Sequence, residues 1–598
     1  MNTYSYLAPG AAKYEGEADY YADFVTKRQL KDVGLWEHFV EVFRTRPDGK
    51  NQGWRGEYFG KMMRGACLTY RYTANEALYA VLEDAVRDLL TTQDDLGRIS
   101  TYTVDSEFTG WDMWGRKYVL TSLLHFREIC KDEALKEEIL TALCRHADYI
   151  AAAFKDGKRD ITKGSRYWGG VNSCSVLEPI VALYKETGRE NYLEFARYII
   201  STGGCSPSYP DPLHGGCKEG SLIDFALENR PPWDYPEVKA YETMSFFEGL
   251  LGYFEVTGEE KYFTAVKNFV RGVAEEDLTL IGCSGCFHEQ FDNSTKKQTD
   301  YASWIMQETC VSVTWMRLLA RLHLLTGEAA YAELLEKTAY NAMFGAVNDH
   351  MLPSVNEQGK VLPIPLPFDS YSPLFNNVRG RGVGGLQYFG DKTYYGCCAC
   401  IGAAGIGLFP LSATLAAEGG LVLDQYLSGT VRGEGLTLTV NSAYPAFGRV
   451  SIGVSGEGIL TLRIPTFAKN VSVRKNTEVL RPEGEYLTLS VSDGDTVTLT
   501  FDMEVTEHVL NGRTAFTYGP LVLARAQSLE GGRDLSLPLH ARRQGGKAVL
   551  RRDKEEDGET VRFRLLTEEG EIPMANYAAL GKRWDKDDRR MTVWMDLL

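Results

Sequence analysis

Tyr184-Lys-Glu-Thr-Gly-Arg-Glu-Asn-Tyr192 is one copy of a pattern that recurs as Phe254-Glu-Val-Thr-Gly-Glu-Glu-Lys-Tyr262 and as Leu324-Leu-Thr-Gly-Glu-Ala-Ala-Tyr331. The three glycines are 70 and 69 residues apart, a period typical of repeated supersecondary units. Each copy predicts a helix that ends at a left-handed glycine and a second helix that begins with acidic residues after a turn. A weaker copy, Tyr72 to Leu78, lacks the glycine. Helical hairpins are therefore the predicted unit of the fold.

A helical pattern continues from about residue 20 to about residue 420. Apolar residues recur with the spacing of an amphipathic helix, as in Leu78, Val81, Leu82, Ala85, Val86 and Leu89. Hairpins stacked over this length predict an α/α toroid. An α-solenoid that serves as a binding scaffold is the alternative, and periodicity alone does not separate the two.

After about residue 425 the apolar period changes to two, which predicts half-buried strands at 436–440, 460–464, 487–491 and 497–501. The Asp493-Gly494 turn predicts that the last two of these strands form a hairpin. Short alternating strands at this density indicate a β-sandwich. The expected organisation is an N-terminal segment 1–20, a helical domain 21–422, a β-sandwich 423–505 and a second β domain 506–598.

Charge and composition argue against a nucleic-acid partner and against a membrane span. The chain has 65 Lys and Arg against 81 Asp and Glu, and its net charge of −16 would repel a phosphate backbone, so we expect no nucleic-acid partner. The uncharged stretch 393–417 contains four glycines and Pro410, so it predicts a buried loop and helix start rather than a membrane span. The N-terminus shows no secretory signal pattern, and we expect a cytoplasmic protein.

Twelve cysteines in a reducing compartment indicate buried thiols, metal ligands or nucleophiles rather than disulfides. The thiolates of Cys397 and Cys398 could enter one metal site, because the nearby glycines permit a non-helical backbone. Glu308 and Cys310 could complete a tetrahedral zinc site with them. The alternative is that the adjacent cysteines are small buried residues. Cys283-x-x-Cys286 is a weak zinc or redox signal.

Glu289 is a candidate general acid. It lies between Phe287 and Phe291, and aromatic neighbours raise the pKa of a carboxyl group by desolvation. The alternative is an exposed glutamate at the end of a loop.

Six segments of the chain together resemble glycoside hydrolase family 127, the β-L-arabinofuranosidase-like enzymes. They are Trp54 to Lys61, Trp111 to Tyr118, Lys239 to Leu251, Gln307 to Cys310, Cys397 to Gly405 and Tyr518 to Leu521. The resemblance covers nearly the whole chain. It implies an (α/α)6 barrel followed by β-sandwich domains, a zinc ion held by one glutamate and three cysteines, and a cysteine that acts as the nucleophile.

Residue by residue, the resemblance implies that Glu308, Cys310 and Cys398 are metal ligands. Cys397 matches both a ligand and the nucleophile, and Glu289 matches the general acid/base. An alternative registration, meaning an alignment to the family in which Cys398 and Cys400 take the places of Cys397 and Cys398, stays open. Two positions that carry histidines in the family's arabinofuranosidases align with Ser175 and Lys239. The resemblance therefore supports the barrel scaffold and the metal site more strongly than it supports the family's sugar specificity.

The predicted function is a zinc-dependent retaining exo-glycosidase that releases a terminal β-L-arabinofuranoside-like or related sugar from oligosaccharides or glycoconjugates. One alternative is an α/α-barrel epimerase or polysaccharide lyase, which would work without a thiolate. Another is a non-catalytic carbohydrate-binding scaffold. The expected partner is a carbohydrate substrate, and the oligomeric state stays open, with a homodimer as one alternative.

Overall fold

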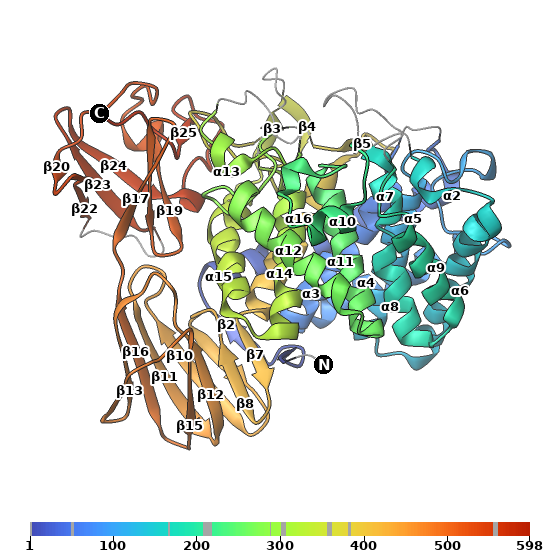
Figure 1. Cartoon of the computed structure of the whole chain (residues 1–598), viewed down its shortest axis with the longest axis horizontal. Helices are drawn as coiled ribbons and strands as arrows, with labels where there is room; N and C mark the ends of the chain where they lie inside the picture. Colours follow the sequence, from blue (N-terminus) through green and yellow to red (C-terminus); the bar gives the residue numbers. More distant parts are fainter. Residues whose placement is uncertain are drawn as a thin grey trace.

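The computed structural model describes residues 3–49, 53–165, 168–206, 218–287, 289–300, 307–355, 361–380, 384–553 and 560–598. The helices form one body, and two groups of strands lie beside it, with the C-terminal group above the other in the view of Figure 1. The helical part is an (α/α)6 barrel and the first group of strands forms a β-sandwich, as predicted, while the C-terminal group forms one main sheet. None of the helices in the described ranges is both long and apolar enough to cross a membrane.

Within the described residues, six inner helices form a closed ring in which each packs against the next and the last returns to the first. They are α3 (Gly56–Thr73), α5 (Asp112–Ile129), α8 (Leu177–Thr187), α11 (Ala240–Thr257), α14 (Thr309–Thr326) and α16 (Cys397–Leu411). The outer helices are α1 (Glu17–Val25), α2 (Val33–Thr45), α4 (Glu76–Leu90), α6 (Glu133–Phe154), α9 (Glu190–Ser201), α12 (Glu260–Gly272) and α15 (Ala329–Thr338).

The repeated glycines end three of the inner helices. Gly188, Gly258 and Gly327 cap α8, α11 and α14 with φ values of 63°, 70° and 73°, in the left-handed region that glycine adopts without steric cost. The weaker copy behaves in the same way, because Ala74 caps α3 with a φ of 47°. The prediction that each copy marks a helical hairpin is confirmed.

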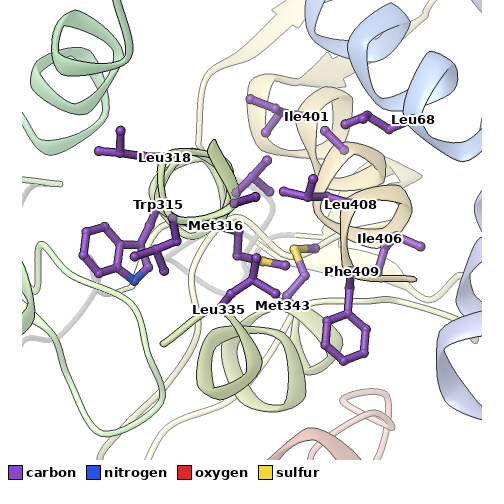
Figure 2. Packing of buried hydrophobic residues seen from close by; sticks show 14 of the residues in the cluster. Leu68, Trp315, Met316, Leu318, Leu335, Met343, Ile401, Ile406, Leu408 and Phe409 are labelled. Carbon is purple, nitrogen blue, oxygen red and sulfur yellow. The ribbon is translucent and has the colours of Figure 1, made fainter. Parts of the chain in front are cut away.

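The inner helix α16 is buried along its whole length, which explains why the stretch 393–417 is uncharged. Figure 2 shows Ile401, Ile406 and Phe409 of α16 in one apolar cluster with Trp315 and Met316 of α14. Each side chain of this size that is removed from water stabilises the fold by about 1.5–3 kcal/mol. This packing fixes the relative position of the N-terminal ends of α14 and α16.

The first β domain consists of two sheets. Among the described residues, one sheet has the strand order β1-β7-β8-β12-β15 and the other has the order β14-β13-β16-β11-β10-β9-β2. The strands of the first are β1 (Ser5–Tyr6), β7 (Thr414–Ala417), β8 (Gly420–Leu423), β12 (Gly458–Arg463) and β15 (Tyr486–Val491). Those of the second are β2 (Ala12–Tyr14), β9 (Gly429–Arg432), β10 (Leu436–Ser442), β11 (Arg449–Gly456), β13 (Lys469–Lys475), β14 (Glu478–Leu480) and β16 (Thr496–Asp502).

The predicted hairpin at Asp493-Gly494 is wrong. β15 pairs with β12, whereas β16 pairs with β11 and β13, so the turn connects the two sheets. The sheets also extend across the domain limits expected at residues 20 and 422, since β1 pairs with β7 and β2 pairs with β9. Strand pairing joins segments that are about 400 residues apart, which local periodicity cannot reveal.

The last part of the chain forms a separate sheet in the order β17-β18-β19-β24-β23-β22. Its strands are β17 (Val505–Leu510), β18 (Arg513–Tyr518), β19 (Leu521–Ala526), β22 (Leu550–Arg552), β23 (Arg562–Thr567) and β24 (Gly570–Asn576). Asn341, close to the C-terminal end of α15, fixes this sheet to the barrel: its Nδ2 donates to the Pro520 carbonyl, and its Oδ1 accepts from the Val522 N–H at 2.8 Å.

Candidate active site and metal centre

The structure brings the four predicted metal ligands together in the barrel. One ligand atom from each of Glu308, Cys310, Cys397 and Cys398 lies within 4.8 Å of the other three, and all four residues are buried. The Sγ atoms of Cys310 and Cys398 are 3.2 Å apart, and each of them lies 3.9 Å from Cys397 Sγ. Glu308 Oε1 is 3.4 Å from Cys398 Sγ. This group could hold a metal ion.

Two helix starts position the ligands. Glu308 is the N-cap residue of α14 and Cys310 is in its first turn, while Cys397 and Cys398 begin α16. A β-bridge between Glu308 and Tyr371 fixes the backbone before α14. The strand pair β5 (Leu386–Tyr388) and β6 (Tyr394–Gly396) delivers the chain to the start of α16. Backbone N–H groups at a helix start favour negative charge, which suits thiolates.

The cysteines differ in acidity. Hydrogen bonds from Cys310 and Cys398 hold the pKa of the Cys397 thiol well below its usual range, and the ammonium groups of Lys61 and Lys239 act in the same direction against burial. Burial raises the pKa of Cys310 and Cys398. Burial, followed by the neighbouring Glu289 carboxylate, also raises the pKa of Glu308 well above its usual range.

Glu289 lies in the same region and is held at both its backbone and its carboxylate. Its carbonyl accepts from the Ala240 N–H at 3.0 Å, Lys239 Nζ pairs with Oε2, and the Tyr371 hydroxyl donates to Oε1. Its φ of 62° is uncommon for a residue with a side chain, and such strain often occurs at functional sites. Tyr371 therefore connects Glu289 with Glu308, because it binds the carboxylate of one and pairs with the backbone of the other.

Two lysines near the cluster stay charged. Burial would lower the pKa of Lys239, but the carboxylates of Glu289, Glu242 and Glu308 outweigh it and raise the pKa. Burial would also lower the pKa of Lys61, but Cys310 and Glu57 outweigh it. The Glu57 carboxyl has a pKa of about 7, because burial and then Cys397 raise it further than Lys61 and Trp114 lower it.

The other predicted residues lie outside the cluster. Cys400 is buried on α16 but does not belong to the group of four, so the geometry favours the registration that uses Cys397 and Cys398. Cys283 Sγ donates to the carbonyl of Glu308 at 3.4 Å, and Cys286 Sγ accepts from Gln307 Nε2 at 2.9 Å. Ser175 donates to the carbonyl of Asn172 at 2.7 Å.

Sequence reasoning assigned no role to three residues that contact the site: Lys61, Tyr371 and Gly385. Lys61 had a detectable signal, since it follows Glu57 by one helical turn within the otherwise uncharged run 56–63. A charged pair on the inner face of a buried helix indicates a specific partner. Tyr371 and Gly385 occur in irregular segments and had no such signal.

Gly385 gives a direct test of how tightly Cys397 is held. The residue has a φ of 55°, and a Cβ atom there would overlap Cys397 Sγ and lie 2.9 Å from Cys397 Cβ. We expect Gly385→Ala to reduce activity at least about tenfold, because overpacking costs about 1–3 kcal/mol in addition to the backbone strain. Gly390→Ala is the matched control, since it has a φ of 96° and no atom within 4 Å of the added Cβ. Equal kcat/KM for the two variants would contradict this prediction.

Comparison with known proteins identifies the class of molecule. The sequence model of the β-L-arabinofuranosidase GH127 catalytic domain matches residues 15–351, more than half of the chain. The protein is therefore a glycoside hydrolase, and its substrates are carbohydrates. It belongs to glycoside hydrolase family 127. The matched range includes Glu289, Glu308 and Cys310, whereas Cys397 and Cys398 lie beyond it.

Solved structures support the same fold over the whole chain. The GH127 β-L-arabinofuranosidase from Geobacillus stearothermophilus T6 is 18% identical with a TM-score of 0.71, and the match covers 98% of this chain and 100% of that one. A GH127 β-arabinofuranosidase is 16% identical with a TM-score of 0.69, over 100% and 98% of the two chains. At these identities the similarity concerns the fold. No curated protein matches the chain by sequence.

Proposed function

We propose that this chain is a zinc-dependent retaining glycosidase that releases a terminal β-L-arabinofuranose or a related sugar. The observation that carries the proposal is the buried group of Glu308, Cys310, Cys397 and Cys398 close to the anchored Glu289. The substrate class rests on the names of the matching family and of its solved members. The family match supports a glycoside hydrolase and not the epimerase, lyase or non-catalytic alternatives.

The geometry of the four residues suits zinc. Tetrahedral coordination with Zn–S bonds of about 2.3 Å requires sulfur atoms about 3.8 Å apart, and a carboxylate oxygen about 3.6 Å from each sulfur. The observed separations of 3.2–3.9 Å between sulfurs and 3.4 Å from Cys398 Sγ to Glu308 Oε1 lie close to these values. Glu308 Oε2 is buried and has no hydrogen-bond partner among the described residues. Bound zinc would keep its thiol ligands deprotonated near neutral pH.

In the first step, Cys397 Sγ attacks the anomeric carbon of the bound sugar, and the glycosidic C–O bond breaks. The electron pair goes to the leaving oxygen, which takes a proton from the Glu289 carboxyl. In the second step, Glu289 removes a proton from water as the water oxygen attacks the same carbon, and the C–S bond breaks. Two displacements on one carbon retain the anomeric configuration.

Lys239 and Tyr371 serve this sequence by orienting Glu289. An ammonium group and a phenol hydroxyl on the two carboxylate oxygens hold the side chain in one rotamer, so that the proton is delivered from a fixed position. The backbone of Tyr371 pairs with that of the proposed metal ligand Glu308 in a β-bridge. The position of the proposed acid/base Glu289 is therefore coupled to the backbone that carries Glu308.

A substrate screen with metal analysis tests the proposed function. We expect p-nitrophenyl β-L-arabinofuranoside, or a related furanoside in a panel that includes pyranosides, to be hydrolysed by protein that contains about one zinc per chain. The product first observed by NMR should have the anomeric configuration of the substrate. Inversion of configuration, or full activity in protein that contains no metal, would reject the mechanism.

Loss of a metal ligand should reduce both metal content and stability. We expect Glu308→Ala and Cys310→Ala to bind less than a tenth of the wild-type zinc at equal free zinc, and to melt at a lower temperature, because bound ligand stabilises the folded state. Cys400→Ala is the control, since it removes a buried thiol from the same helix as Cys397 but outside the group of four. If Cys400→Ala lost zinc and Cys310→Ala did not, the ligand assignment would be wrong.

A further inference from the structure

Lys61 is a buried lysine in contact with the cysteine cluster. Its side chain is 2% exposed, and its Nζ atom lies 3.9 Å from Cys310 Sγ and 3.0 Å from Glu57 Oε1. Three aromatic rings surround the ammonium group, with centroids at 5.8, 5.5 and 4.6 Å, and they belong to Trp114, Tyr118 and Tyr241. Burying an ammonium group is costly unless anions and aromatic faces replace its water. The surroundings of Lys61 therefore supply the anions and aromatic faces that a buried ammonium group requires, which indicates a specific role for its charge.

The proposed metal centre has a charge that needs compensation. Three thiolates and one carboxylate carry four negative charges, and a divalent ion supplies two positive ones, so the occupied site has a formal charge of −2 in a buried region. An uncompensated buried charge costs several kcal/mol. Lys61 contacts the cluster at Cys310, whereas Lys239 pairs with Glu289, outside the group of four.

We propose that Lys61 is the counter-cation of the metal centre and donates an N–H···S hydrogen bond to the metal ligand Cys310. It is a positioning residue, because it acts on the ligand and not on the sugar. The inference rests on the proposed function, since it requires that the group of four binds a divalent ion. Glu57, one turn earlier on α3, holds the ammonium group toward the cluster through its ion pair.

A purely structural role for Lys61 is the competing explanation. The ion pair with Glu57 and the aromatic rings would stabilise the barrel whether or not a metal is bound. The two explanations differ in their dependence on metal. A counter-cation contributes most when the thiolates are ionised and coordinated, whereas a structural residue contributes equally in the metal-bound and metal-free protein.

The test measures zinc affinity in the full chain by competition with a chromophoric chelator at one pH. We expect Lys61→Met to weaken zinc binding about 10–100-fold, the range typical of residues that support metal ligands. Lys61→Arg, which keeps the charge and a donor, should stay within about threefold of wild type. Lys117→Met is the matched control, because Lys117 is also fully buried and stacks on Trp114, but its anionic partner is Glu178 at 3.7 Å.

Two further measurements separate the explanations. The fall in melting temperature caused by Lys61→Met should be larger in zinc-bound than in zinc-free protein. In cobalt-substituted protein, the thiolate-to-cobalt charge-transfer band should move to lower energy in Lys61→Met, because the sulfur loses a hydrogen-bond donor. If Lys61→Met does not fold, Lys61→Gln removes the charge with less change in polarity and is measured in the same way.

The possible results distinguish a counter-cation role of Lys61 from a structural role and from a failure of the proposed zinc dependence. Unchanged zinc affinity and an unchanged cobalt spectrum in a folded Lys61 variant would overturn the inference and leave the proposed function intact. Equal losses of affinity in Lys61→Met and Lys117→Met would assign both lysines to barrel stability. If the wild-type chain itself bound no zinc or cobalt, the proposed zinc dependence would fail first.

Discussion

Replacing Cys397 with serine should abolish turnover of every substrate while the protein stays folded. A serine hydroxyl has nearly the same size as the thiol but remains protonated at neutral pH, so it cannot take over the role of the thiolate. We expect kcat to fall about 10⁴–10⁶-fold, the loss typical of a missing nucleophile. The loss should be equal on an aryl glycoside and on a natural glycoside, because attack on the anomeric carbon is needed whatever the leaving group.

The neighbouring cysteines provide the control for this prediction. Cys400→Ser changes a thiol in the same turn of α16 and should keep most of the activity, because Cys400 lies outside the group of four. Cys397 is also a proposed ligand, so zinc content is measured in parallel and the rates are compared at equal zinc occupancy. Retention of more than about 1% of the activity by zinc-loaded Cys397→Ser would exclude it as the nucleophile.

Glu289→Gln should show a loss that depends on the leaving group. An acidic phenol departs with little protonation, so the first step on an aryl glycoside should be largely retained. A natural glycoside needs the proton, and its turnover should fall about 10²–10⁴-fold. Glutamine keeps the size of the side chain. Its amide oxygen can still accept from Lys239, and its NH2 group can donate to the Tyr371 hydroxyl oxygen, so the effect reports on the proton.

Azide provides a second readout for the same variant. Azide attacks without a general base, so it should restore turnover of an aryl glycoside by Glu289→Gln and yield a glycosyl azide of unchanged anomeric configuration. Equal impairment on both substrates with no azide rescue would assign the acid/base to another carboxylate. Glu242 is then the first candidate, since it is buried in the first turn of α11 and burial raises its pKa.

The helical part of the fold could be predicted well because its signals are local. A left-handed residue at the end of a helix depends on the conformation of that residue and its immediate neighbours, and Gly188, Gly258, Gly327 and even Ala74 adopt it. The period-two segments likewise identified β10, β12, β15 and β16 to within two residues at each end. The sequence alone could not pair these strands, because the Asp493-Gly494 turn is compatible with a hairpin and with a crossing between sheets.

For the candidate site, too, the sequence predicted one part and the tertiary structure decided another. The sequence supplied the identities of the cysteines and glutamates and, through a family resemblance, their expected roles. The tertiary structure decided which of them meet: α14 and α16 bring Glu308 and Cys310 to Cys397 and Cys398 across almost 90 residues, while Cys283, Cys286 and Cys400 stay outside the group.

Only the folded barrel reveals the surroundings of these groups. The hydroxyl of Tyr371 reaches Glu289 from a segment 82 residues away, and Lys61 reaches Cys310 across 249 residues. The sequence by itself predicted the ends of α8, α11 and α14 and the extents of four strands, because those signals depend on neighbours within one turn or one pleat. The tertiary structure decided the pairing of strands, the membership of the metal group and the charges around it, because these depend on packing between segments that are distant in the chain.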